Sequence, residues 1–283
     1  MNFGQESAGI FVPNGLPADE ALARTTHMGV GAHPDDLEIL ACHGILRCFD
    51  NEAHWFCGVV MTDGAGAPRS GPYAGYSDAE MVALRRGEQE KAAVVGGYGS
   101  QVMLDYPSSA VKDPDDDRPT GDLAHIIGAA RPEAIYTHNP ADRHETHVAT
   151  VLRVIEAIRR LPAEARPELV YGCEVWGALD WLPEQETVAF DVSDHENLQW
   201  ALLGVFDSQI CGGKRYDLAS MGRRRANATY QESHEVDAAS GMIFAMDLTP
   251  LVWDDGLDAG AYVGTLIEGF AQGVAERIKT LSA

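Results

Sequence analysis

Two short segments, far apart in the chain, concentrate the residue types that bind metal ions and transfer protons. The first, GAHPDDLE, contains His33, Asp35 and Asp36, and the second, HNPADRHETH, contains His144 and His147. A catalytic zinc ion takes about three histidine or carboxylate ligands and leaves one position for water. His33, Asp36 and His147 would supply two imidazoles and one carboxylate for such a site.

The two remaining groups, Asp35 and His144, are of the types that hydrolysis of an amide requires. Water bound to a metal ion reaches a pKa of roughly 7, and a nearby carboxylate can take its proton during attack on a carbonyl. Asp35 is the natural base because its neighbour Asp36 is committed to the metal, and the metal's charge should keep Asp35 ionised. His144 would stabilise the developing oxyanion and then protonate the leaving amine. The pattern predicts metal-assisted hydrolysis of an amide.

The elements that must position these residues are predicted from short apolar runs that alternate with helical patterns, as in β and α units around a parallel sheet. Residues 26–32 are the expected first strand and 37–49 the following helix, with Asp35 or Asp36 near its N-cap. The other expected strands are 54–61, 101–106, 132–138, 168–176, 187–192 and 242–248, and the other expected helices are 78–96, 120–130, 144–161, 197–206 and 259–281. We therefore predict a single-domain α/β fold over residues 1–283, with a Rossmann-like, largely parallel sheet flanked by helices.

Both histidine segments follow predicted strands. The strand over 26–32 precedes His33, and the strand over 132–138 precedes His144 and His147. Ligands of open parallel sheets bind beyond the carboxyl ends of the strands, where loops from neighbouring strands converge. The two later histidines are three residues apart and would share a face of the first helical turn. We therefore expect groups that are distant in sequence to meet at one site.

A long loop is predicted between the second strand and the next helix. Residues 63–77 (DGAGAPRSGPYAGYS) are rich in Gly, Pro and Ser, and loops of this length are often functional. Arg69 lies in this loop and is the predicted substrate-binding residue, by contact with a hydroxyl or phosphate of the substrate. The loop would then decide which substrate the protein accepts.

The composition argues against several classes of protein. The 21 Lys and Arg against 43 Asp and Glu give a formal charge of −22, which opposes binding to nucleic acid. The five cysteines are widely spaced and include no CxxC pair, so neither a zinc knuckle nor a disulfide framework is indicated. No apolar run of about 18 residues predicts a membrane span, and the N-terminal region has no leader pattern. We expect a cytoplasmic protein of undetermined oligomeric state.

The first segment resembles the signature of a known family. AHPDDLE, residues 32–38, is similar to the AHPDDxE motif of the PIG-L/LmbE-like zinc-dependent N-acetylglucosaminyl deacetylases, with every fixed position filled. The second segment resembles the downstream histidine motif of that family, and weaker similarities occur at MTDG (61–64), RRGE (85–88) and DSQ (207–209). The resemblance covers about residues 26–210, and residues 211–283 remain unassigned.

The resemblance implies a role for each matching residue. His33, Asp36 and His147 would bind one zinc ion per chain, Asp35 would be the general base, and His144 would assist electrostatically. These roles agree with the chemistry expected from the residues alone. Iron and manganese also accept histidine and carboxylate ligands, so the choice of another divalent metal stays open.

The chain departs from the family pattern at two positions. The family commonly has Asp directly before its second metal histidine, where this chain has Thr146, so Asp142 becomes the candidate for orienting His144. Phe206 stands where relatives often have His before the SQ element.

The leading hypothesis is a zinc-dependent deacetylase that removes the N-acetyl group, a linear amide, from a sugar or glycoconjugate by means of zinc-activated water. One alternative is an amidase that cleaves a larger acyl group from an amine conjugate. A non-catalytic metal-binding protein is a second alternative, against which Asp35 and His144 stand beside the expected ligands. A nucleotide-binding module is a third, but Pro34 replaces the last glycine of the GxGxxG pattern that Gly29 and Gly31 begin.

Overall fold

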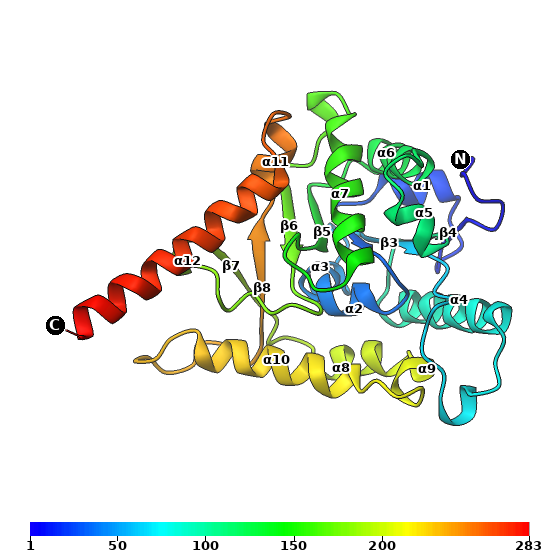
Figure 1. Ribbon diagram of the computed structural model, residues 1–283. Helices are drawn as coiled ribbons and strands as arrows, with labels where there is room; N and C mark the ends of the chain where they lie inside the picture. The colour runs from blue at the N-terminus through cyan, green and yellow to red at the C-terminus, as the bar shows by residue number, and fades with distance from the viewer. Residues whose placement is uncertain (283) are drawn as a thin grey trace.

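One eight-stranded sheet forms the centre of the molecule (Figure 1). The computed structural model describes residues 1–282. The strands are β1 (Gly9–Phe11), β2 (His27–Gly31), β3 (Phe56–Thr62), β4 (Ser100–Tyr106), β5 (Ala134–His138), β6 (Leu169–Cys173), β7 (Thr187–Asp191) and β8 (Met242–Asp247). Their order is β1-β4-β3-β2-β5-β6-β8-β7; the four pairs from β4 to β6 are parallel, and β1, β8 and β7 pair antiparallel. The predicted α/β fold with a largely parallel sheet is confirmed.

Helices cover both faces of this sheet (Figure 1). They are α1 (Ala18–Ala23), α2 (Asp36–Leu40), α3 (Cys42–Cys48), α4 (Asp78–Val95), α5 (Ser108–Lys112), α6 (Arg118–Ala130), α7 (Glu145–Arg159), α8 (Glu196–Gly204), α9 (Asp207–Ile210), α10 (Tyr216–Tyr230), α11 (Thr249–Trp253) and α12 (Ala259–Leu281). On one face α7 contacts α5, α6 and α11, and α6 also contacts α1. On the other face α8 contacts α2, α4 and α10.

The central strands are buried along their whole length, as the apolar runs predict. Every residue of β2, β3, β4 and β5 is buried. Parallel strands that carry helices on both faces need apolar side chains on both, which explains the continuous apolar character of these runs. Two hydrophobic clusters result, one on each face of the sheet, and they hold the strand ends in fixed positions.

The strand order places a natural crevice beside β2. The chain runs from β2 to β3 and β4 on one side of the sheet and then returns to β5 on the other side. Crossovers that leave a strand in opposite directions open a crevice at the carboxyl ends, where ligands of such sheets bind. The segment after β2 carries His33, and the segment after β5 carries His144 and His147. The predicted convergence of the two histidine segments therefore follows from the topology.

Several elements differ from the sequence-based expectation. The helix expected over 37–49 is two helices, α2 and α3, divided at Ala41. Asp35 stands at the N-cap position of α2, but its side chain makes no capping hydrogen bond because it points to a neighbouring helix. Strand β1 and helices α1 and α10 were not predicted from the sequence. The last of these omissions matters, because α10 lines the cavity described below.

The last helix, α12, extends away from the body of the molecule (Figure 1). Val263 and Leu266 near its start are buried, and its later residues are mostly exposed. Among residues 1–282, no helix combines the length and the apolar character that crossing a membrane requires.

Candidate active site

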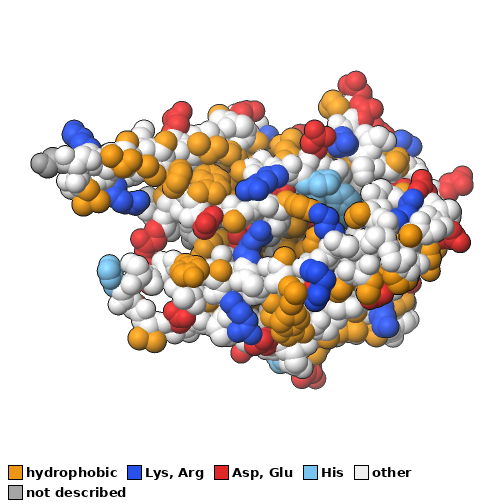
Figure 2. Space-filling view, turned by 60° about the horizontal axis from the view of Figure 1, so that its bottom comes forward, with side chains coloured by type: hydrophobic (Ala, Val, Ile, Leu, Met, Phe, Trp, Pro, Cys, Tyr) orange, Lys and Arg blue, Asp and Glu red, His pale blue; other side chains and the backbone are white. Residues whose placement is uncertain are grey.

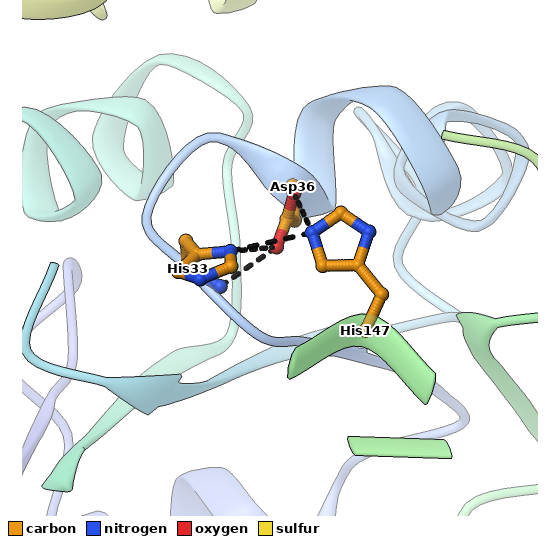
Figure 3. A group of neighbouring side chains, drawn as sticks. All are labelled: His33, Asp36 and His147. Carbon is orange, nitrogen blue, oxygen red and sulfur yellow. Dashed lines mark hydrogen bonds and ion pairs between the residues drawn. The ribbon is translucent and has the colours of Figure 1, made fainter. Parts of the chain in front are cut away.

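His33, Asp36 and His147 face one another at the carboxyl ends of β2 and β5 (Figure 3). His33 Nδ1 lies 3.2 Å from Asp36 Oδ2 and 3.3 Å from His147 Nε2. His147 Nε2 also lies 3.4 Å from Asp36 Oδ1. The three residues predicted as metal ligands, drawn from segments more than a hundred positions apart in sequence, thus bring their donor atoms to one point.

The spacing of these donor atoms fits a tetrahedral metal ion. Zinc bonds to nitrogen and oxygen ligands are about 2.0–2.1 Å long, so neighbouring donor atoms of a tetrahedral site lie about 3.3–3.4 Å apart. His33 Nδ1 and His147 Nε2 are 3.3 Å apart, and they lie 3.2 and 3.4 Å from different oxygens of Asp36, Oδ2 and Oδ1 respectively. Two neutral imidazoles and a carboxylate are also the donor set that catalytic zinc sites use. The residues present therefore fit a divalent metal.

Backbone and side-chain contacts fix the orientation of these ligands. Asp36 Oδ2 accepts a hydrogen bond of 2.7 Å from the backbone N–H of His33, which closes the turn after β2. His138, the last residue of β5, accepts a hydrogen bond of 2.9 Å at Nε2 from the backbone N–H of Ala32 and stacks on His147 at 3.8 Å between ring centroids. The backbone donor requires a lone pair on that nitrogen, so His138 is neutral. His138 thus combines a backbone hydrogen bond with packing against a ligand.

Asp142 orients a different histidine from the one expected. Its Oδ2 lies 3.5 Å from His147 Nδ1, on the side of that ring away from the other donor atoms. Its Oδ1 accepts a hydrogen bond from the backbone N–H of His144, at 2.9 Å, so it fixes the turn but does not contact the His144 ring. The expectation that Asp142 orients His144 is corrected: its carboxylate holds His147, and a carboxylate behind a metal-binding histidine fixes both tautomer and ring direction.

The electrostatics of the cluster favour an ionised carboxylate among imidazoles. Burial acts against the charge of Asp36, but the facing ring of His147 and the hydrogen bond from His33 help to outweigh it, and the pKa of Asp36 lies well below its usual range. Burial also opposes protonation of His147, but Asp36 and Asp142 outweigh burial and raise the His147 pKa. The site therefore already stabilises positive charge at the position where a cation would bind.

Asp35 lies beside the cluster in a strained backbone conformation. Its φ of 95° is in the left-handed region, unusual for a residue other than glycine, and its N–H donates to Gln89 Oε1. Its Oδ2 lies 3.2 Å from the guanidinium of Arg85. Burial raises the pKa of Asp35 to about 8, and Arg85 opposes that rise. A bound cation would shift the balance further toward the ionised form that a general base requires.

His144 occupies the N-cap position of α7, one helical turn before His147. The two rings are 4.6 Å apart between centroids, and the His144 ring is 5.0 Å from that of His33. Burial and the neighbouring imidazoles of His147 and His33 lower the pKa of His144. The predicted shared face of the two histidines is confirmed, and His144 lies where it can contact a substrate bound at the cluster.

A cavity of about 450 Å³ opens above these residues. Its lining includes His33, Asp35, Asp36 and His144, so two of the three predicted ligands and both proton-transfer groups reach one space. The space-filling view shows a hollow with apolar walls beside a histidine, with Lys and Arg side chains gathered around it (Figure 2). A cavity of this size suits a small organic substrate.

Arg69, the predicted substrate-binding residue, does not belong to the cavity lining within residues 1–282. Its guanidinium donates to the carbonyl of Ala65 and forms a 2.5 Å ion pair with Asp78 at the start of α4. Its loop neighbours Ala67 and Pro68 line the cavity, whereas Arg69 is not among the residues of 1–282 that form the lining. The placement shows an arginine that shapes the loop from outside the cavity.

Helix α4 connects the loops that surround the site. Arg85 donates to the carbonyls of Gly64 and Pro34 as well as to Asp35. One turn later, the two carboxylate oxygens of Glu88 accept hydrogen bonds from the N–H and the hydroxyl of Ser208 at 2.7 and 2.6 Å. The RRGE and DSQ segments are therefore in direct contact, which explains why these residue types occur together.

The cavity residues that were not assigned from the sequence include Trp176, Lys214, Tyr216 and Arg223. Trp176 follows β6, at the carboxyl edge of the sheet, and this position was a usable signal. The other three belong to α10 or to the turn before it, in a region with no recognisable motif. Aromatic and cationic residues are common on protein surfaces, so their types alone did not distinguish them.

Comparison with protein families identifies the class of protein that this fold and site define. The model of the family described as GlcNAc-PI de-N-acetylase (PIG-L) matches residues 28–174, more than half of the chain, and the chain belongs to this family. The matched region contains both histidine segments and ends before α10. No curated protein sequence matches the chain.

Solved structures share the fold at low sequence identity. The N,N'-diacetylchitobiose deacetylase of Pyrococcus horikoshii is 20% identical, with a TM-score of 0.57 over 78% of this chain and 83% of that chain. Teicoplanin deacetylase Orf2, in its zinc-inhibited form, is 17% identical, with a TM-score of 0.58 over 79% and 97%. The hydratase GalB of Pseudomonas putida KT2440, which acts on 4-carboxy-2-hydroxymuconate, is 17% identical, with a TM-score of 0.57 over 79% and 96%. The fold thus supports more than one chemistry, so the function must be argued from the site.

Proposed function

We propose that this protein is a metal-dependent hydrolase that removes the N-acetyl group from a sugar or sugar conjugate. The observation that carries the proposal is the convergence of the donor groups of His33, Asp36 and His147 beside a cavity that Asp35 and His144 also line. Membership of the GlcNAc-PI de-N-acetylase family supports it. Two of the structural neighbours are named as deacetylases of a chitobiose and of teicoplanin.

His33, Asp36 and His147 would hold the metal, and Asp142 would keep the His147 ring turned toward it. A divalent metal at this position polarises a carbonyl and lowers the pKa of water to about 7. Zinc is the proposed metal because the donor set of two imidazoles and a carboxylate suits zinc. One structural neighbour, teicoplanin deacetylase Orf2, was solved in a zinc-inhibited form. Because zinc inhibits that neighbour, the metal that activates this protein must be determined directly.

Asp35 is the proposed general base. Its carboxylate takes a proton from the attacking water while the ion pair with Arg85 holds that carboxylate in place. The left-handed backbone at Asp35 lets two adjacent aspartates serve different tasks, because it turns the carboxylate of Asp35 toward α4 and leaves that of Asp36 among the imidazoles. His144, at the cavity wall, would stabilise the developing oxyanion, and the proton that Asp35 takes from the water would pass on to the leaving amine, directly or through His144.

The test is acetate release from a panel of N-acetylated sugars and longer N-acyl analogues, with the wild type and Asp35→Asn compared at equal metal content. We expect release by the wild type and a loss of about 10²–10⁴-fold in kcat for the variant, as removal of a general base causes. Equal rates would overturn the role of Asp35. Release only from longer acyl analogues would make the protein an amidase of larger acyl groups, and no release from any panel member would refute the proposal. A cytoplasmic location remains a separate prediction.

A further inference from the structure

The cavity has a second wall, built from the turn after β6 and from α10, which the proposed chemistry does not use. Lys214, Tyr216 and Arg223 line it together with Trp176. Lys214 Nζ lies 5.1 Å from the centre of the Trp176 ring, and the Tyr216 ring meets the same indole edge to face at 6.2 Å. This wall therefore joins aromatic surface to two positive charges, and Figure 2 shows blue side chains around the hollow.

The two cations of this wall lack the acidic partners that neighbouring arginines have. On the same segment, Arg215 pairs with Asp217 at 2.7 Å, and Arg225 pairs with Glu196 at 2.5 Å. Within residues 1–282, neither Lys214 nor Arg223 has a carboxylate at ion-pair distance, although the chain has about twice as many acidic as basic residues. Positive charges that stay unpaired in a strongly acidic protein are available to an anionic ligand.

Arg223 is held in place by the backbone of the same wall. Its Nη1 donates a 2.5 Å hydrogen bond to the carbonyl of Val175, the residue before Trp176. This contact uses one N–H group of the guanidinium and fixes its direction at the cavity wall. A guanidinium that is already oriented loses less conformational entropy when it binds a carboxylate or phosphate.

The Trp176 ring links these charges to the metal cluster. It lies 6.3 Å from the ring of His144, and His144 lies beside His33. Lys214 Nζ lies 5.1 Å from the same indole ring. A sugar whose amide reaches the cluster would therefore share the cavity with Trp176 and with the two cations of this wall.

The charges of the cavity lining also favour an anionic ligand. Within residues 1–282, the acidic residues of its lining are Asp35 and Asp36. Both already have partners: Asp35 forms an ion pair with Arg85, and Asp36 contacts the imidazoles. Lys214 and Arg223 then have no counter-charge within the lining, and the carboxylate that interacts electrostatically with Arg223 is that of the buried Glu174, outside the lining. The net charge of −22 repels anions at a distance, so an anionic substrate needs local cations of this kind to bind.

We propose that the substrate carries an anionic group, a phosphate or a carboxylate, which Lys214 and Arg223 bind at the cavity wall that they form with Trp176. The proposal deepens the proposed deacetylase function and rests on it. It assigns Lys214 and Arg223 as residues that determine specificity, because they contact the substrate away from the reacting bond.

The test compares N-acetylglucosamine derivatives that differ in charge: the methyl glycoside, the carboxymethyl glycoside, the 1-phosphate and the 6-phosphate. Acetate release is measured for wild type, Lys214→Met, Arg223→Gln and the control Arg225→Ala, which removes a cation from the same helix outside the cavity lining. We expect kcat/KM for at least one anionic derivative to exceed that of the methyl glycoside by about tenfold or more. Lys214→Met and Arg223→Gln should each reduce this preference about fivefold or more, through KM, whereas Arg225→Ala should keep it. Comparison of the carboxymethyl glycoside with the two phosphates shows whether the protein prefers a carboxylate or a phosphate.

A binding measurement separates this proposal from the deacetylase function itself. Calorimetric titration of metal-loaded Asp35→Asn with the same four derivatives reports affinity without turnover. Tighter binding of an anionic derivative, weakened by Lys214→Met and by added salt, supports the proposal even where no derivative is hydrolysed. Equal affinity for neutral and anionic derivatives, or a preference that survives both cavity substitutions, overturns it. Acetate release from the methyl glycoside with no preference for charge would overturn this inference and leave the deacetylase function standing.

Discussion

Strand β2 has a group of histidines at each end, and the two groups differ in their surroundings. At its start His27 lies 5.3 Å from His54 between ring centroids, and His43 stacks on Phe190 at 4.3 Å. At its end His33 meets His147 and the carboxylate of Asp36. Both groups are rich in imidazole, but the first has aromatic neighbours and the second has carboxylates and a cavity.

The protonation behaviour of the two groups follows from these neighbours. Burial lowers the pKa of His27 and of His43 to about 4, and nearby cationic groups add to the effect. At the other end, Asp36 and Asp142 raise the pKa of His147 against the effect of burial. A histidine cluster becomes a site for cations through its carboxylates, and without them it is a neutral part of the core.

The largest expected effect is on metal binding, and it separates the two histidine groups: removing an imidazole at the end of β2 should weaken binding, and removing one at its start should not. We expect His147→Ala to weaken metal binding by more than the roughly 10- to 100-fold that partners of metal ligands contribute, and to abolish acetate release. His43→Gln removes an imidazole from the other group and should bind metal like the wild type. Metal titration of both variants checks the pair. Equal metal affinity in His147→Ala and wild type would contradict the assignment.

A smaller effect is expected from Asp142→Asn, which keeps the shape of the side chain and removes its charge. Because Asp142 lies behind His147, metal affinity should fall about 10- to 100-fold, and saturating metal should restore most of kcat. The readout is acetate release as a function of metal concentration. A loss of kcat that excess metal does not restore would mean that Asp142 acts on the reaction by another route.

The smallest effect concerns stability in acid. A histidine whose pKa is about 4 in the folded protein and about 6.5 when unfolded binds more protons when unfolded between these values. Its contribution to stability is full above pH 6.5 and is lost as the pH falls toward 4, at up to about 1.4 kcal/mol per pH unit. Denaturant unfolding across this range should show a shallower acid decline for His43→Gln than for wild type. Parallel curves would show that His43 does not titrate as its burial implies.

The sequence alone was enough to predict the site residues that directly follow a strand. His33, Asp35 and Asp36 follow one strand directly, and His144 and His147 follow another, so the rule that carboxyl ends converge was enough to join them. The regular alternation of apolar runs similarly predicted the parallel sheet. The closing helix over 259–281 was predicted with the bounds that the structure has.

Other features depend on contacts that sequence spacing does not encode. Asp142 lies two residues before His144 and five before His147, and only the turn geometry shows that its carboxylate faces His147. The contact of Arg85 with Asp35 depends on how α4 packs against the turn after β2. Helix α10 was missed because its residues are mostly polar and its apolar face is narrow. Its Arg223 consequently had no predicted place in the site.

The most direct test of the catalytic metal site is to titrate zinc into chelated wild-type protein and follow acetate release from the best substrate of the panel. We predict no release without metal and a rise that reaches its maximum at about one equivalent per chain, as expected for one set of three ligands. The same titration with other divalent metals identifies the most active ion. Full acetate release by metal-free protein would contradict the central claim that His33, Asp36 and His147 form a catalytic metal site.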